Sequence, residues 1–84
     1  MPDVTLKLFA SLTDYLPKHA QDNKAQIEVS DSDTVGAIIK RYNLPEKLVH
    51  LVLVNGVFIT PEDRPNRVLK EGEVLAIWPP VAGG

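Results

Sequence analysis

Cysteine is absent from this chain of 84 residues, which excludes disulfides, thiolate metal sites and a cysteine nucleophile. Positive charge is not in excess either, since nine Lys and Arg stand against eleven Asp and Glu. Binding to a nucleic-acid backbone needs a cationic surface, so we expect no nucleic-acid partner. No hydrophobic run approaches the ~20 residues of a membrane span, and the first residues lack the features of a signal peptide. We therefore expect a cytoplasmic protein with no membrane partner.

Hydrophobic residues make up 44% of the chain, which places it among globular proteins. A chain of this length buries roughly 60 to 65% of its unfolded surface, enough for one core. That size leaves little material to enclose an elaborate active site. We expect one domain that is not an elaborate enzyme on its own.

Two segments near the start alternate apolar and polar residues, as a strand does when one face lies on a core. The first runs from Val4 to Ala10 and places Phe9 on the outer face. The second covers residues 25–29 and is expected to pair antiparallel with the first. Between them, residues 11–20 have a few apolar positions at helical spacing, which predicts a short helix or turn.

The main helix is predicted after the segment 30–33, Ser-Asp-Ser-Asp, which is rich in residues that cap helix N-termini. Apolar residues at 35, 38, 39 and 42 then match one helix face. The helix should end near Asn43, because Leu44 precedes Pro45 and is biased away from helical geometry. Gly36 lowers helix propensity by about 1 kcal/mol relative to Ala, which indicates close packing at that position.

The second half of the chain predicts a short turn at 46–48 and a hairpin, with Asn55-Gly56 between the apolar runs 51–54 and 57–59. Residues 60–66 are expected to be loop, and residues 74–78 the last strand. One long helix across one sheet face, with the other face open, is an α+β roll. Ala76 and Trp78 would face outward together with Phe9, and Leu75 and Ile77 would face the helix.

For most residues that could be catalytic, bind a metal or bind a partner, a purely structural role is favoured. His19 and His50 are isolated from any motif, and helix capping is favoured over a calcium loop for Asp31 and Asp33. A solvated loop is favoured over an acidic partner for the basic residues at 64, 67 and 70.

The segment 79–84, Pro-Pro-Val-Ala-Gly-Gly, is the strongest functional signal. The two prolines favour an extended polyproline II backbone, and six residues reach about 20 Å, far enough to enter the active site of another protein. Gly83 and Gly84 lack side chains, so the carboxylate of Gly84 can pass a narrow channel and be the reactive group. The alternative is a frayed terminus. We expect a domain over residues 1–78 and a flexible reactive tail over residues 79–84.

The combination of V-T-L-K-L-F-A, T-V-G-A-I-I, V-N-G, E-G-E-V-L-A-I-W and P-P-V-A-G-G resembles the MoaD/ThiS sulfur-carrier family, and MoaD-type members most. The resemblance implies a ubiquitin-like β-grasp fold with a mixed sheet. It also implies that Phe9, Phe58 and Trp78 form an apolar partner-binding face, with residues Pro79, Pro80, Val81 and Ala82 also contacting the partner.

The chemistry that the resemblance implies begins with adenylation of the Gly84 carboxylate by an ATP-using enzyme of the ubiquitin-activating type. Sulfur then replaces the adenylate as a thiocarboxylate. A MoaE-type large subunit would accept the tail and pass the sulfur to cyclic pyranopterin monophosphate. The chain itself would bind no cofactor or metal, would be a monomer alone, and would form a heterotetramer with the large subunit.

Two other functions use the same terminal chemistry. One is a ubiquitin-like modifier that is joined to other proteins through Gly84. The other is a sulfur carrier for thiamin or another thiolated product. The acceptor enzyme distinguishes these alternatives.

Overall fold

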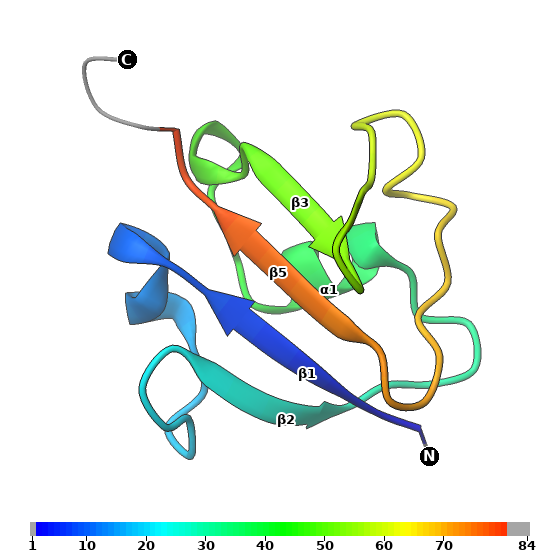
Figure 1. Cartoon of the computed structure of the whole chain (residues 1–84), viewed down its shortest axis with the longest axis horizontal. Coiled ribbons are helices and arrows are strands. Elements are labelled where there is room, and N and C mark those ends of the chain that lie inside the picture. Colours follow the sequence, from blue (N-terminus) through cyan, green and yellow to red (C-terminus); the bar gives the residue numbers. More distant parts are fainter. Residues whose placement is uncertain (1, 81–84) are drawn as a thin grey trace.

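The computed structural model describes residues 2–80 and contains, within them, a mixed five-stranded sheet with one α-helix behind it (Figure 1). In chain order, the elements are β1 (Asp3–Leu8), the 3₁₀ helix η1 (Ala10–Tyr15), β2 (Lys24–Glu28), α1 (Val35–Arg41), the 3₁₀ helix η2 (Glu46–Leu48), β3 (Leu51–Val54), β4 (Val57–Phe58) and β5 (Val74–Trp78). The predicted α+β class and the mixed sheet are confirmed.

The strand order is β2-β1-β5-β3-β4, so the first and last strands lie side by side at the centre of the sheet. β1 and β5 run parallel, whereas β1–β2, β3–β5 and β3–β4 are antiparallel. A parallel pair needs a crossover connection, and the segment that contains α1 provides it on one face. Within residues 2–80, no α-helix lies on the other face of the sheet (Figure 1).

The core lies between the sheet and α1, and it follows from the alternation of each strand. Leu75 and Ile77 of β5 are fully buried, as predicted. The inward residues of the other central strands are buried too: Val4, Leu6, Leu8, Val52 and Val54. Val35 and Ile38 cover this layer from the helix.

The helix begins one residue later than the capping residues that the sequence analysis favoured. The Oγ1 of Thr34 accepts a hydrogen bond from the Ala37 N–H at 3.1 Å, so Thr34 is the N-cap. The Asp33 carboxylate instead accepts the Ser30 N–H at 2.8 Å and pairs with Arg41, so the capping role expected of Asp33 is wrong. Asp31 also lies outside the cap.

The helix ends as predicted, just before Leu44 and Pro45. Asn43 has φ +58°, and the N–H groups of Asn43 and Leu44 donate to the carbonyls of Lys40 and Ile39. This pair of bonds is a Schellman motif, which satisfies carbonyls at the end of the helix.

Two boundaries near the start differ from the prediction. β1 ends at Leu8 and not at Ala10, because Ala10 has φ +53° and begins η1. The short helix is therefore a 3₁₀ helix that ends at Tyr15, earlier than the predicted range 11–20. Among the described residues, no helix is long and apolar enough to cross a membrane.

Candidate functional site

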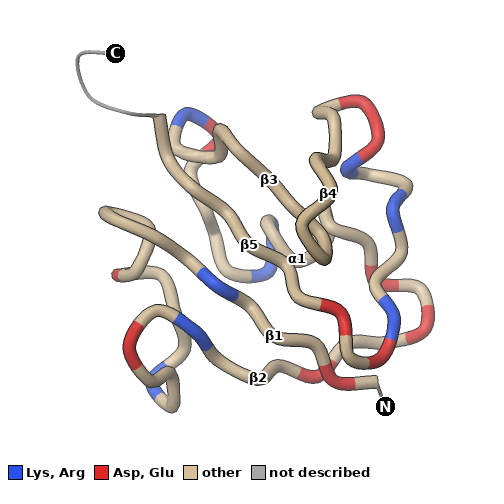
Figure 2. Tube along the Cα trace, in the orientation of Figure 1, with Lys and Arg blue, Asp and Glu red and all other residues tan. Residues whose placement is uncertain are grey.

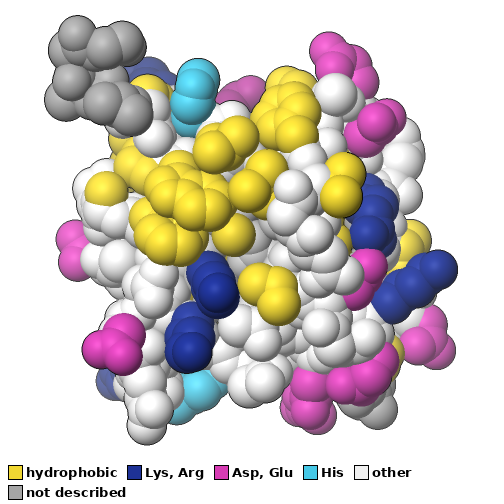
Figure 3. Space-filling model, viewed as in Figure 1, with side chains coloured by type: hydrophobic (Ala, Val, Ile, Leu, Met, Phe, Trp, Pro, Cys, Tyr) yellow, Lys and Arg dark blue, Asp and Glu magenta, His cyan; other side chains and the backbone are white. Residues whose placement is uncertain are grey.

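Hydrophobic side chains gather on the open face of the sheet, near the end of β5 (Figure 3). We call this set the apolar band: Phe9, Leu51, Leu53, Phe58 and Trp78. The sheet register explains how the band forms, because residues directly opposite on antiparallel strands share a face. Trp78 is opposite Leu51, and Leu53 is opposite Phe58.

The centre of the apolar band is an aromatic pair. The rings of Phe9 and Trp78 stack with their centroids 4.1 Å apart and their planes 5° from parallel. Both residues are half-buried, so much of each ring is covered by the other ring and by the sheet. The sequence analysis predicted that both would face outward, and the structure confirms it.

Phe58 lies at the other end of the apolar band and is 49% exposed. It belongs to β4, a strand of two residues at the sheet edge after the Asn55-Gly56 turn. Positive φ values of 51° and 82° at these two turn residues give the hairpin that the sequence predicted. The three aromatic residues of the prediction thus occupy one face, with Phe58 joined to the stacked pair through two leucines.

Those two leucines, Leu51 and Leu53, were missed as outward-facing residues. The run Leu51-Val52-Leu53-Val54 is apolar at every position, so alternation of polarity could not show which residues face outward. The pairing of β3 with β5 shows which residues face outward, because Leu51 is directly opposite Trp78 and therefore lies on the same face.

The end of β5 is hydrogen-bonded to the chain on both of its sides. The Phe9 N–H donates to the Ile77 carbonyl at 3.3 Å, and the His50 N–H donates to the Trp78 carbonyl at 3.1 Å. Pro79 and Pro80 follow and have no N–H groups, so they stop the hydrogen-bonded ladder there. Val81, Ala82, Gly83 and Gly84 lie outside the described residues, and the reactive tail stays a prediction.

Two basic residues of the loop before β5, Arg64 and Arg67, have side-chain partners within the fold. Arg67 forms an ion pair with Glu73 at 2.7 Å, and the Arg64 side chain donates to the carbonyl oxygens of Ile59 and His50. The hydrogen bonds from Arg67 hold the pKa of the Glu73 carboxyl below its ordinary value, against the opposing effect of partial burial. Arg64 and Arg67 are half-buried and bound within the fold, which differs from the solvated loop that the sequence favoured, whereas Lys70 is exposed as that loop implied.

Neither histidine belongs to a metal centre in the part of the chain that the structure describes, where no group of three or more His, Cys, Asp or Glu residues is placed to hold an ion. The Nε2 of His19 instead lies 2.8 Å from the Gln26 carbonyl oxygen, so this nitrogen carries the proton and donates.

The mixed sheet, the single covering helix and the open apolar face define a ubiquitin-like α+β protein of the β-grasp type. Residues 6–84 match the model of the ThiS family. This match covers most of the chain and includes Gly83 and Gly84. The chain belongs to this family of ubiquitin-like sulfur carriers, as its resemblance to MoaD and ThiS proteins implied.

Solved structures with the same fold carry two kinds of description, SAMP1 and molybdopterin converting factor. SAMP1 from Haloferax volcanii is 24% identical, with TM-score 0.67 over 98% of this chain and 99% of that one. A putative molybdopterin converting factor subunit 1 from Pyrococcus furiosus is 21% identical, with TM-score 0.70 over 96% and 100%. A complex of subunits 1 and 2 of the molybdopterin-converting factor from Helicobacter pylori includes a chain 26% identical, with TM-score 0.59 over 98% and 99%. The search of curated proteins gave no match.

Proposed function

We propose that this protein is the small, sulfur-carrying subunit of a molybdopterin synthase. The observation that carries the proposal is the apolar band at the end of β5, directly before Pro79 and Pro80. A large subunit that covers this band would hold the start of the tail beside its own active site. The structures named for molybdopterin converting factor subunit 1, one of them in complex with subunit 2, support this choice of partner.

In the proposed reaction, an adenylating enzyme of the ubiquitin-activating type joins the Gly84 carboxylate to AMP and releases pyrophosphate from ATP. Sulfide supplied by a sulfur donor then attacks the acyl carbon, displaces AMP and loses its proton, which leaves a thiocarboxylate. The MoaE-type large subunit accepts the tail, and the sulfur passes to cyclic pyranopterin monophosphate. This chain contributes no catalytic side chain: it supplies the terminal carboxylate, the reach of the tail and the docking surface.

The first test is a mass measurement. Incubation with the cognate adenylating enzyme, ATP and a sulfur donor should exchange one oxygen for sulfur, and fragmentation should locate the exchange at Gly84. A variant that lacks Gly83 and Gly84 is the matched control, because the buried core of the described residues lies between Val4 and Ile77. We expect the control to keep its Tm and to show no exchange.

The second test asks whether the loaded protein, with its cognate large subunit, converts cyclic pyranopterin monophosphate to molybdopterin. Formation of the thiocarboxylate without this product would contradict the synthase proposal while leaving a sulfur carrier for thiamin or another product. An unchanged mass, when a known carrier is converted in the same assay, would contradict the carrier chemistry itself.

A ubiquitin-like modifier is the second candidate. It is favoured by the similarity to a protein named small archaeal modifier protein 1, which is 22% identical with TM-score 0.69. An adenylated carboxylate can be attacked by a lysine amine as well as by sulfur. Higher-mass conjugates linked through Gly84 in its own cells, absent in the variant without Gly83 and Gly84, would favour this function.

A further inference from the structure

Two lysines face each other on the open side of the sheet, next to the apolar band. Lys7 of β1 is directly opposite Lys24 of β2 in the antiparallel register. Lys7 also lies two residues before Phe9 on the same face, about 7 Å away along the strand. Figure 3 shows Lys or Arg side chains directly beside the gathered hydrophobic ones. Figure 2 shows positively charged positions on both β1 and β2.

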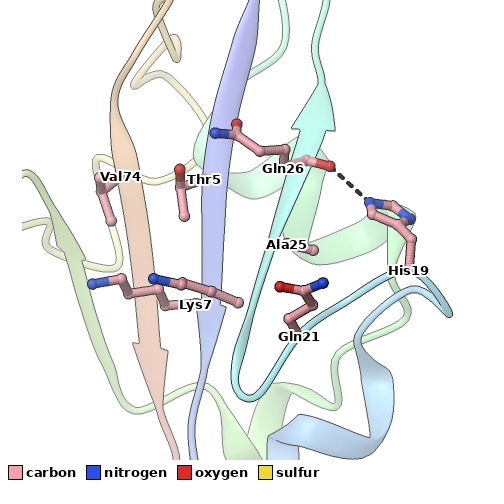
Figure 4. Close-up of a pocket in the computed structure, with 8 residues that line it drawn as sticks. Thr5, Lys7, His19, Gln21, Ala25, Gln26 and Val74 are labelled. Carbon is pink, nitrogen blue, oxygen red and sulfur yellow. Dashed lines mark hydrogen bonds between the residues drawn. The ribbon is translucent and has the colours of Figure 1, made fainter.

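An open hollow of about 460 Å³ accompanies these lysines. Its lining includes Lys7, Lys24, Thr5, Val74 and, at the outer side of β2, His19. Lys7 leaves β1 on the same side of the sheet as Thr5 and Val74 (Figure 4). The hollow therefore combines two ammonium groups with Thr5 and Val74, which lie on the side of Lys7 away from the apolar band.

The positive charge here is not neutralised within the described residues, whose ion pairs are Arg41–Asp33 and Arg67–Glu73. Like charges directly opposite each other in a sheet are destabilising. The acidic pair Asp3 and Glu28 lies at the far end of the same two strands. That end is about 13 Å from Lys7, beyond the screening length of about 8 Å at physiological salt. The fold thus places two lysines without an ion-pair partner among the described residues at the end of the sheet where the apolar band lies, and Asp22 in the turn before β2 is the acidic residue nearest to Lys24 in the sequence.

We propose that Lys7 and Lys24 bind carboxylates of the large subunit that docks on the apolar band. This inference rests on the proposed function, and it adds the chemistry that the partner must present: an apolar contact flanked by Asp or Glu side chains. In the reversed orientation the same carboxylates of the partner would lie beside Asp3 and Glu28, which would repel them. The charges therefore favour one orientation of the partner on the sheet.

A protein carboxylate fits this site better than a free anion does. Lys24 is exposed and Lys7 is half-buried, so water competes for both ammonium groups. A free anion would have to bind from solution against that competition. A carboxylate on a partner that already covers Phe9 and Trp78 is held nearby, so its effective concentration is high.

Charge reversal of each lysine tests the proposal. Association of the purified chain with its cognate large subunit is measured for the wild type, Lys7→Glu and Lys24→Glu at low and at physiological salt. We expect each variant to lower the association rate constant at low salt by about tenfold, and added salt to reduce the difference. Lys40→Glu is the matched control, because Lys40 is an exposed residue of α1, on the other side of the sheet. It should change the rate by less than about twofold.

Zero-length carbodiimide coupling gives a second, independent measurement on the wild-type complex. This reagent joins an amine to a carboxylate that touches it, so peptides linking Lys7 or Lys24 to Asp or Glu of the large subunit are expected. Their absence, together with unchanged association of the two charge-reversal variants, would overturn this inference while leaving the proposed function intact. A wild-type chain that does not bind the large subunit would overturn both.

A small anion is the competing occupant of the hollow. Inorganic phosphate and ATP are titrated into the free protein while the amide signals of Lys7 and Lys24 are followed by NMR. We expect no saturable change at millimolar concentration. Saturable binding at these two residues would assign the hollow to a small anion and overturn the proposed contact with protein carboxylates.

Discussion

At the scale of single residues, Gly36 sets how closely α1 approaches the loop before β5. Its N–H donates to the Arg64 carbonyl at 2.8 Å. A Cβ added at Gly36 would lie 3.2 Å from the Pro65 Cα and 3.3 Å from the Arg64 oxygen. Both contacts are with backbone, which cannot turn aside as a flexible side chain can. The close packing that the sequence predicted at this glycine is confirmed.

We predict that Gly36→Val lowers the free energy of unfolding by about 1–3 kcal/mol, because the added methyl groups must displace this loop backbone. Lys40→Val is the matched control, since it introduces the same β-branched residue at an exposed position of the same helix. Denaturant unfolding of the two variants measures the difference. An unchanged stability in Gly36→Val would contradict the prediction, because replacing Gly by Val raises helix propensity and only the contact with the loop backbone opposes it.

Glu73 is the second residue with a measurable signature. Its carboxylate accepts hydrogen bonds from the Arg67 guanidinium at 2.7 and 3.1 Å and from the Lys70 N–H at 2.8 Å. These bonds lower its pKa in the folded protein, with Arg67 as the main cause. A lowered folded pKa means that the unfolded chain binds the proton more readily. The stabilisation is therefore present above the ordinary glutamate pKa of about 4.3 and is lost as the pH falls below it.

We predict that Glu73→Gln is less stable than the wild type at neutral pH and loses less of its stability on acidification. Urea unfolding at a series of pH values from about 7 down to 2, through the ordinary range of glutamate titration, measures both effects. Arg67→Gln, which removes the partner, should also reduce the acid dependence. If Glu73→Gln loses as much stability on acidification as the wild type does, the ion pair with Arg67 is not the cause of that loss.

At the scale of elements, β2 is an edge strand whose outward carbonyls are all occupied. The carbonyl oxygens of Lys24, Gln26 and Glu28 accept hydrogen bonds from the Gln21 N–H at 2.9 Å, from the His19 Nε2 at 2.8 Å and from the Arg41 Nη1 at 2.9 Å. An open strand edge invites pairing with another chain, and covering it prevents this. His19 therefore acts as a structural cover of the sheet edge.

We predict that His19→Ala increases concentration-dependent self-association, because the Gln26 carbonyl becomes available to a second strand. Light scattering over a concentration series measures this. His19→Gln should restore the monomer, since its amide can donate in place of the imidazole. His50→Ala is the control, as this exposed histidine lies in the loop before β3 and not at the edge. If His19→Ala stays monomeric, the hydrogen bonds from Gln21 and Arg41 are sufficient to protect the edge of β2.

Alternation of polarity predicted which faces β1 and β2 bury, because both strands have polar residues on their outer face, whereas β5 is apolar at every position. It could not choose Thr34 as the cap among five consecutive candidates, since the backbone geometry at the helix start decides that. Nor could it place Lys7 opposite Lys24, because that register depends on how residues 9–23 close the connection between the strands. The cover provided by His19 likewise depends on this connection.

At the scale of the whole molecule, one sheet has two faces with different tasks. The face under α1 holds the fully buried core, whereas the open face carries the apolar band beside the exit of β5 (Figures 1 and 3). An exposed apolar patch on a small domain usually marks a binding surface. The three aromatic residues are not equivalent in this respect. Phe58 is 49% exposed, whereas Phe9 and Trp78 are half-buried against each other.

We predict that Phe58→Lys and Trp78→Lys each weaken association with the large subunit by about 2 kcal/mol, because buried aromatic anchors dominate interface energies. Trp78→Lys should also lower stability by about 0.5–1.5 kcal/mol through loss of the stacked pair, whereas Phe58→Lys should not. Val57→Lys is the matched control, since Val57 is in the same hairpin, is 64% exposed and lies outside the apolar band. Affinity and denaturant unfolding are measured for all three variants. Normal binding by Phe58→Lys and Trp78→Lys, with a large loss of stability in both, would assign these rings to the core and contradict the docking surface.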